Sequence, residues 1–225
     1  MANIAIIPAR AGSTRLPNKN FINLAGKPLV QHTIDAVVSA GCFDRIIVTT
    51  NSPEVKEIAV GSGVEIHDRP EEFATTRATV VSAIIAMLES MDIGDDSISY
   101  FLPTCPFRSS DDIKKGFQFL TEADSVISTS YYDEPPQLAM IEGDSGFVYP
   151  IFDNLRAGLT NSKYIQKYVK PNGGFYMSRW RMIKESGHFF NGKIKGVLLP
   201  KERSVDIDTI EDLKYAEAVF EQQLS

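Results

Sequence analysis

The sequence predicts an α/β fold built on a mainly parallel sheet. Short apolar runs alternate with amphipathic patterns over roughly the first 130 residues, and this alternation is typical of strand–helix–strand units. The connections between these patterns are short, which suits crossovers between parallel strands. The chain has 225 residues, of which 43% are hydrophobic and 23% charged. This is enough for one globular domain, or for one domain with a subdomain.

Each element of this first part is predicted from its own apolar pattern. In the segment Pro28–Ala40, for example, Leu29, Ile34, Val37 and Val38 fall on one side of a helix. The predicted strands are Ile4–Ile7, Arg45–Thr50, Val64–His67, Ile98–Leu102 and Ser125–Thr129. The predicted helices are Pro28–Ala40, Pro53–Ser62, Val80–Ser90 and Ser110–Glu122.

The regular alternation breaks near Tyr131. Residues 133–168 contain prolines, glycines and asparagines with little periodicity, which predicts an inserted excursion with short strands that serves in dimerisation. Further strands are expected at Gly173–Ser178, Lys195–Leu199 and Val205–Ile207, before a last helix, Thr209–Gln223. Thr209 is a plausible N-cap of that helix, and the acids Glu211 and Asp212 suit its first turn. We expect the aromatic residues Phe175, Tyr176 and Trp180 to pack in a core or a subunit interface.

The composition narrows the possible functions. The net charge of −6 gives no support for general nucleic-acid binding. The two cysteines and three histidines form no metal-ligand spacing and no disulfide framework. No apolar run approaches the ~18 residues that would span a bilayer, and the first residues lack the apolar region of a signal peptide. We therefore expect a soluble, cytoplasmic protein without a membrane partner.

Positive charge is concentrated in the loop after the first predicted strand. Residues 9–20 contain Arg10, Arg15 and Lys19, together with Gly12 and Ser13, and the first acid of the chain comes only at position 35. Backbone amides at a strand end beside a helix start can bind an anion, arginine can grip phosphate oxygens as a fork, and lysine adds a mobile charge. The loop matches neither a Walker A motif nor G-x-G-x-x-G. The alternative is a solvated basic loop with a turn at Gly12.

Two carboxylates lie close together near the other end of the chain. If residues 205–207 form a strand, Asp206 and Asp208 point to one side, while Val205 and Ile207 point to the other. Two residues of a strand span roughly 6.6 Å, so both carboxylates can reach one cation. Mg²⁺ is commonly held by one or two carboxylates together with phosphate oxygens. The alternative is a solvated strand end that leads into a helix cap.

Several blocks of the sequence together resemble one family. The segment Pro8–Ser13, followed by Lys19-Asn20, resembles the signature loop of the cytidylyltransferases that activate acidic 2-keto sugars, such as the CMP-sialic acid synthetases. The later blocks that match in order are Gly26–Leu29, Thr49–Asn51, Arg69–Ala74, Pro103–Arg108, Asn172–Tyr176 and Asp206–Asp208. The resemblance covers nearly the whole chain except about residues 133–167. It implies a Rossmann-like three-layer sandwich of the nucleotide-diphospho-sugar transferase type, with a small dimerisation subdomain inserted at about 131–178.

The resemblance also implies a reaction. The anomeric hydroxyl of the sugar attacks the α-phosphorus of CTP, and pyrophosphate leaves, which requires positioning and charge neutralisation more than a protein nucleophile. The expected sugars are of the sialic, legionaminic or pseudaminic type. The alternatives are a CMP-octulosonate (Kdo-type) synthetase or a non-catalytic nucleotide-binding protein on the same fold. A homodimer is expected.

The implied site residues fall into three groups. Arg10, Lys19 and Asp208 are the expected catalytic residues, and Asp206 and Asp208 the expected Mg²⁺ ligands. The nucleotide is expected to meet Ala9, Arg10, Gly12, Ser13, Lys19, Asn20 and Arg69. The sugar side is expected to involve Leu102, Thr104, Arg108, Lys170 and Asn172, with Arg108 and Lys170 as candidates for the sugar carboxylate.

The chain departs from the family pattern at several positions. Relatives that use sialic acid usually carry a glutamine where Leu102 stands, and an aliphatic side chain cannot hydrogen-bond to a sugar. The family often has an aspartate at the position of Thr76, and Arg77 follows here either as an anion ligand or as a solvated residue. The run Thr14–Pro17 resembles the octulosonic-acid branch instead. The identity of the sugar therefore stays open.

Two further residues invite a catalytic reading that we do not favour. Cys105 has no helix start or histidine beside it in sequence, so we interpret it as the counterpart of the family's serine, not as a nucleophile. His67 is interpreted as a strand-end residue instead of a general base, because an ordinary pKa near neutrality is weak support for a catalytic role.

Overall fold

The computed structural model describes residues 1–13, 15–75, 78–161, 163 and 165–223. Thr14, Thr76 and Arg77, which the sequence analysis singled out, lie outside these residues. The chain divides into two compact units: Met1–Thr129 with Pro171–Ser225, and Ser130–Lys170. Among the described residues, no helix combines the length and the apolar character needed to cross a bilayer.

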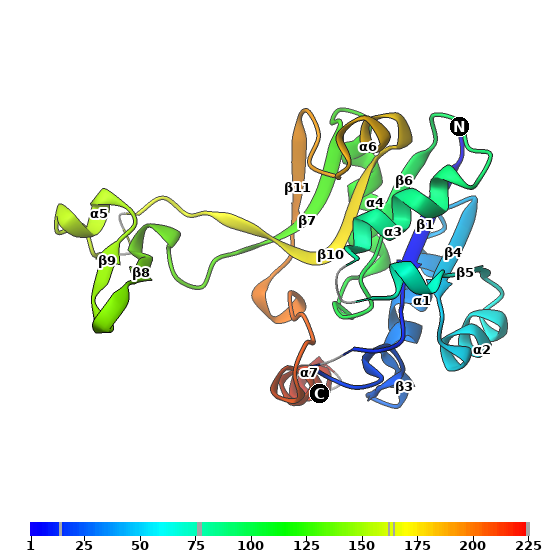
Figure 1. Cartoon of the computed structure of the whole chain (residues 1–225), viewed down its shortest axis with the longest axis horizontal. Helices are drawn as coiled ribbons and strands as arrows, with labels where there is room; N and C mark the ends of the chain where they lie inside the picture. The colour runs from blue at the N-terminus through cyan, green and yellow to red at the C-terminus, as the bar shows by residue number, and fades with distance from the viewer. Residues whose placement is uncertain (14, 76–77, 162, 164, 224–225) are drawn as a thin grey trace. The chain divides into compact units, whose positions relative to one another are not determined.

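A seven-stranded, mostly parallel sheet organises the first unit (Figure 1). Its strands, in spatial order, are β11 (Ile194–Leu198), β7 (Ser125–Tyr131), β10 (Val169–Arg179), β6 (Ser97–Tyr100), β1 (Asn3–Pro8), β4 (Arg45–Thr50) and β5 (Glu65–Asp68). Strand β1 pairs in parallel with β4 and β6, β4 with β5, and β11 with β7. Strand β10 runs antiparallel to β6.

Helices cover both faces of this sheet, as expected for a three-layer α/β sandwich. The helices are α1 (Leu29–Ala40), α2 (Pro53–Gly61), α3 (Val80–Glu89), α4 (Ser110–Leu120), α6 (Trp180–Ser186) and α7 (Ile210–Gln223). Alternate residues of β1 face opposite ways: Ala5 and Ile7 join the core formed with α1, α2 and α4. Ile4 and Ile6 join the core formed with α3 and α6. A hydrophobic cluster of residues from α7 and the loops around β2 (Asn23–Leu24) completes the unit.

Most predicted elements are confirmed, with three differences. Residues 205–207 are not a strand: they lie in irregular chain between β11 and α7 and pair with no strand among the described residues. Helix α6 was not predicted, because its start at Trp180 lacks a polar cap and its pattern is short. Val38 is 46% exposed, so the buried stripe of α1 is narrower than expected. Phe175 and Trp180 are core residues as expected.

Helix α3 begins at a side-chain cap whose strength can be measured. The Thr79 hydroxyl accepts a hydrogen bond from the Ser82 backbone N–H at 3.0 Å. Thr79→Ala is expected to lower the free energy of unfolding by about 1 kcal/mol, because that N–H loses its partner. Chemical denaturation tests this. Thr121→Ala is the matched control, since Thr121 donates to a carbonyl at the end of α4 and caps no N–H; an equal loss in both variants would contradict the capping argument.

The second unit, Ser130–Lys170, contains a small antiparallel hairpin. Strand β8 (Met140–Glu142) pairs with β9 (Val148–Pro150), and the short helix α5 (Asp153–Arg156) follows. The backbone N–H of Tyr132 donates to the carbonyl of Tyr168 and joins the two ends of the unit. Large apolar side chains are exposed along this hairpin and its flanks in the single chain: Met140, Ile141, Phe147, Val148, Tyr149, Ile151 and Phe152.

Candidate active site

The candidate site lies where the carboxyl ends of β1, β4 and β6 meet. These strands are neighbours and parallel, so the loops that follow them come together at one edge of the sheet, which is the usual ligand position in open α/β sheets. The loop after β1 carries Arg10 to Asn20, and the segment after β6 carries Leu102 to Thr104. The chain between β11 and α7 brings Asp206 and Asp208 to the same place.

Hydrogen bonds to neighbouring strands fix the basic loop. The Ala9 N–H donates to the Thr49 carbonyl at 3.0 Å, and the Ala9 carbonyl accepts from the Thr50 hydroxyl at 2.6 Å. The Ala11 N–H donates to Asn51 Oδ1 at 2.8 Å. Asn20 donates through Nδ2 to the Arg10 carbonyl at 2.9 Å. Ala9 is fully buried with both backbone groups engaged, so its place favours a role in loop support over ligand contact.

The same loop needs glycine at one position. Gly12 has a φ of +76°, a left-handed conformation, while an added Cβ would meet nothing within 4 Å. A side chain here is therefore excluded by backbone strain and not by crowding. The turn brings Gly12 and Ser13 into the wall of a hollow of about 340 Å³, which also includes Phe21 and the start of α2.

A second hollow of about 230 Å³ shares Arg10, Ser13, Lys19 and Asn20 with the first. Its remaining wall consists of Pro8, Arg69, Val80, Leu102, Pro103, Thr104, Asp206 and Asp208. Cationic side chains and carboxylates therefore line one pocket together, although they are almost 200 residues apart in the chain. Of the sequence-predicted residues, those proposed for the nucleotide (except Ala9), both carboxylates, Leu102 and Thr104 contribute to these two hollows.

Arg69 is a buried cation with unused donor capacity. It is 5% exposed, and its Nε has no hydrogen-bond partner among the described residues. Burial lowers the pKa of Arg69, and the positive charge of Arg10 lowers it further. Arg10 itself donates to the Ala74 carbonyl at 2.8 Å. Two guanidinium groups at one pocket wall, one of them with an unsatisfied donor, form a place suited to an anion.

The carboxylates face the basic loop across the pocket. Asp208 accepts from Lys19 Nζ at 2.6 Å through Oδ1 and from Arg15 at 2.7 Å through Oδ2. Restricted hydration raises the pKa of Asp206; a hydrogen bond from Thr104 opposes this shift, and the negative charge of Asp208 adds to it. A divalent cation would relieve that repulsion. Arg15 was not assigned a role from the sequence, although it lies within the basic run that gave the signal.

The acidic segment is held by burial of its alternate residues. Val205 and Ile207 are 8% and 0% exposed, and the Ile207 N–H donates to the Thr104 carbonyl at 2.8 Å. Asp206 and Asp208 consequently turn toward the pocket, as the alternation predicted, even though the predicted strand is absent. Among the described residues, no group of three or more His, Cys, Asp or Glu side chains forms a metal cluster. The chain therefore offers two carboxylates, which fits Mg²⁺ completed by phosphate oxygens and water.

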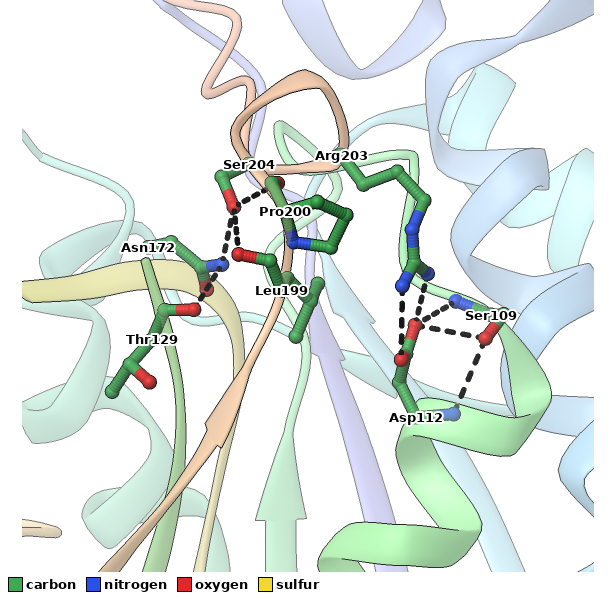
Figure 2. Close-up of polar contacts among 8 residues, drawn as sticks. All are labelled: Ser109, Asp112, Thr129, Asn172, Leu199, Pro200, Arg203 and Ser204. Atoms are coloured by element: carbon green, nitrogen blue, oxygen red, sulfur yellow. Dashed lines mark hydrogen bonds and ion pairs between the residues drawn. The ribbon is translucent and has the colours of Figure 1, made fainter. Parts of the chain in front are cut away.

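Three of the expected sugar-side residues do not line these hollows. Arg108 is 3% exposed, and its guanidinium donates to the Thr33 hydroxyl at 2.7 Å and to the Leu102 carbonyl. Asn172 is 7% exposed and bonds to Thr129 and Ser204 (Figure 2). These positions favour structural roles. Lys170 belongs to the second unit, where its ammonium lies 5.6 Å from the centre of the Tyr132 ring.

The structure also places Cys105 and His67, which the sequence analysis did not favour as catalytic residues. The Cys105 thiol is 2% exposed and donates to the Asn172 carbonyl at 3.0 Å. Burial raises the pKa of this thiol, so it stays protonated and is a poor nucleophile. His67 lies on β5 with Nδ1 3.0 Å from the Thr49 hydroxyl, and burial lowers its pKa.

Asn51 is a residue whose role the sequence did not reveal. Its Oδ1 accepts from the Ala11 N–H, and its Nδ2 donates to Glu71 at 3.3 Å. Asn51→Ala is expected to weaken CTP binding about 10-fold, because an unpaired N–H costs about 1–3 kcal/mol and the basic loop loses its fixed conformation. Calorimetry with CTP measures this. Asn23→Ala is a control, since Asn23 supports an exposed turn; equal weakening in both variants would contradict the assignment.

Comparison with known proteins agrees with the geometry. The cytidylyltransferase family profile matches residues 4–153. The CMP-N,N'-diacetyllegionaminic acid synthase of Legionella pneumophila is 34% identical, covering 98% of this chain and 97% of the relative. The pseudaminic acid cytidylyltransferase of Campylobacter jejuni is 28% identical over 98% of this chain and 97% of its own length. The N-acylneuraminate cytidylyltransferase of Streptococcus agalactiae is 31% identical over 94% of this chain, which spans about half of that relative.

A solved structure shares the fold. The CMP:2-keto-3-deoxy-manno-octonic acid synthetase complexed with CTP superposes with a TM-score of 0.72 over 99% of this chain and all of that one, at 15% identity. The family profile and these relatives show that the chain is a nucleotidyltransferase, and the basic loop opposite paired carboxylates at one edge of the sheet agrees with that class. Within that class, this chain belongs to the cytidylyltransferase family.

Proposed function

We propose that this chain joins CTP to an acidic nine-carbon 2-keto sugar of the legionaminic, sialic or pseudaminic type and releases pyrophosphate. The observation that supports this most strongly is the pocket in which Arg10, Lys19 and Arg69 face Asp206 and Asp208. The relatives named above, with their printed activities, support the same substrates.

The residues suggest how the reaction proceeds. Arg10, Arg69 and Lys19 would bind the triphosphate and neutralise the charge that develops on departing pyrophosphate. The sugar's anomeric oxygen forms a bond to the α-phosphorus, the bond from that phosphorus to the β-phosphate oxygen breaks, and the hydroxyl proton passes to water. Asp206 and Asp208 would hold Mg²⁺, which when bound polarises the α-phosphate. Leu102 and Thr104 line the second hollow, and the sugar would bind next to them.

The direct test measures pyrophosphate release from CTP and Mg²⁺ with a panel of legionaminic, sialic, pseudaminic and octulosonic acids. Release with a nine-carbon sugar is expected. Release with the octulosonic acid alone would replace the proposal by the Kdo-type alternative, and no release with any sugar would contradict it. Calorimetry with CTP, UTP, GTP and ATP tests the nucleotide, and preferred binding of ATP or GTP would exclude the cytidylyl assignment.

We further propose a homodimer formed through the second unit. The supporting observation is the group of exposed apolar side chains on its hairpin, among them Ile141 and Phe147, which are 59% and 64% exposed and would be covered by a second copy. Sedimentation of the Ile141→Asp, Phe147→Asp double variant is expected to give a monomer where the natural chain gives a dimer. Val60→Asp is the control, because Val60 is 68% exposed on the other unit; an unchanged dimer in the double variant would contradict the proposal.

A cytoplasmic location is also proposed. It is supported by the two cysteines, Cys42 and Cys105, which are both free thiols, since unpaired thiols persist in a reducing compartment. Localisation of a tagged chain by cell fractionation would test this.

A further inference from the structure

The chain that carries the paired carboxylates is anchored at both ends by its backbone. At its start, the Leu199 N–H donates to the Thr129 carbonyl at 2.8 Å, and near its end the Ile207 N–H donates to the Thr104 carbonyl. The residues between these anchors pair with no strand in the described chain. Their position therefore depends on side chains: Val205 is buried, and Arg203 and Ser204 make the polar attachments.

Arg203 binds Asp112 on α4 with both ends of its guanidinium. One end lies 2.5 Å from Oδ2, and the other lies 3.3 Å from Oδ1 (Figure 2). The Asp112 carboxylate is 13% exposed and also accepts from the Ser109 N–H and hydroxyl, each at 2.8 Å. Although burial opposes ionisation, the hydrogen bonds from Arg203 and Ser109 lower the pKa of Asp112. The pair is thus charged, partly buried and fixed to the first turn of a helix.

Ser204 makes a second attachment on the other side of the same turn. Its hydroxyl accepts from Asn172 Nδ2 at 3.0 Å and donates to the Pro200 carbonyl at 2.9 Å. Asn172 also donates to the Thr129 carbonyl at 3.3 Å and accepts from the Gly174 N–H at 3.1 Å. Figure 2 shows Arg203 and Ser204 reaching to opposite sides of the loop. The turn is therefore tied to α4 on one side and to the sheet on the other.

We infer that Arg203, held by Asp112, is a positioning residue for Asp206 and Asp208, with the Ser204–Asn172 hydrogen bond as a second tie. The inference rests on the proposed function. Neither Arg203 nor Asp112 lines the two hollows, so the pair acts on the carboxylates only through the chain. Three residues span at most roughly 10 Å, so a displacement of Arg203 changes where the chain can place Asp206. Groups that hydrogen-bond directly to a metal ligand typically change metal affinity 10- to 100-fold when they are removed, so the lower end of that range is expected for a group that acts through the chain.

The test compares metal binding in the natural chain with Arg203→Met and Arg203→Lys. Mn²⁺ is titrated in the presence of CTP without sugar and followed by electron paramagnetic resonance, and the Mg²⁺ dependence of turnover is measured separately. Arg203→Met is expected to bind Mn²⁺ about 10-fold more weakly and to need correspondingly more Mg²⁺, with kcat restored at saturating Mg²⁺. Arg203→Lys keeps the charge but loses the fork geometry, so partial recovery is expected.

The controls separate positioning from simple structural damage. Lys114→Met removes an exposed cation paired with Asp111 on the same helix and is expected to leave Mn²⁺ affinity unchanged. Ser204→Ala, which removes the second tie, is expected to weaken Mn²⁺ binding several-fold and decides the case if Arg203→Met does not fold. If the Arg203→Met variant folds and binds Mn²⁺ with natural affinity, the positioning role of Arg203 is overturned, while the proposed metal site stands. Absence of metal binding in the natural chain would instead overturn the proposed metal site and this inference with it.

Discussion

Asp208→Ala is expected to lower kcat/KM for CMP-sugar formation by about 10³-fold. Asp208 is the carboxylate that meets Lys19 and Arg15 at the pocket, and with Asp206 it would hold the cation that stabilises charge on the phosphates. A metal ligand of this kind accounts for several kcal/mol of transition-state stabilisation, and about 4 kcal/mol corresponds to ~10³-fold in rate. Initial rates of pyrophosphate release over a range of sugar concentrations, at a fixed saturating CTP concentration, give the loss in kcat/KM.

The variant should fold, because the start of α7 does not depend on the Asp208 side chain. The helix is capped by Thr209 and Asp212: the Asp212 N–H donates to the Thr209 hydroxyl at 3.2 Å, and the Asp212 carboxylate accepts from the Thr209 N–H at 2.8 Å. Asp208→Asn keeps the size and is expected to lose activity equally. Glu211→Ala removes an exposed acid from the same turn and should change the rate less than 2-fold. Full activity in Asp208→Ala would contradict the metal assignment.

Asp208→Ala also distinguishes an enzyme from a non-catalytic nucleotide-binding protein on the same fold. Such a protein would keep its nucleotide affinity in the variant and would show no turnover in the natural chain. An enzyme of the proposed kind shows turnover in the natural chain and loses it in the variant. Calorimetry with CTP and the pyrophosphate assay, carried out on both proteins, give the two readings.

Arg69→Met is expected to weaken CTP binding about 100-fold without lowering the stability of the ligand-free protein. The Arg69 guanidinium is buried, has an unsatisfied Nε and lies close enough to Arg10 for their charges to repel. Its charged form is therefore disfavoured in the folded state, and a methionine of similar length removes that penalty. Hydrogen bonds to a charged phosphate are worth about 1.5–3 kcal/mol, and 2.7 kcal/mol is ~100-fold in affinity.

Arg108→Met provides the contrast. Arg108 is also buried, and its Nε also lacks a partner among the described residues, but it lines neither hollow. Arg108 donates to the Thr33 hydroxyl and the Leu102 carbonyl, so its removal leaves buried acceptors unpaired and is expected to destabilise the fold by about 3 kcal/mol. Thermal unfolding and CTP calorimetry on both variants give the comparison. A large loss of stability in Arg69→Met, or unchanged CTP affinity, would contradict the assignment of Arg69.

The parts of the site that lie in short runs of sequence could be predicted, whereas the hydrogen-bond partners of individual side chains could not. The basic loop and the Asp206/Asp208 pair are visible as short runs, and the place of the basic loop at a strand end follows from the α/β alternation. Arg108, by contrast, looks like an anion ligand in the sequence, but Thr33, 75 residues away, takes its guanidinium. Asn172 likewise donates a hydrogen bond to the Ser204 hydroxyl instead of to a ligand. Such partners depend on tertiary packing, which no local pattern encodes. Tertiary packing also explains why the strand predicted at 205–207 is absent. Its alternate residues are buried as in a strand, but no neighbouring strand pairs with them.

The ion pair between Lys19 and Asp208 affects the order in which nucleotide and metal would bind. In the ligand-free chain Lys19, which we propose binds a phosphate, neutralises Asp208, which we propose binds a cation. With the proposed roles, CTP alone would have to separate Lys19 from its carboxylate, and Mg²⁺ alone would have to displace an ammonium. The metal–nucleotide complex would exchange both partners in one event, so that each ligand would lower the free-energy cost of binding the other. By linkage this coupling would be reciprocal, and the ion pair would favour binding of the preassembled complex over binding of either component.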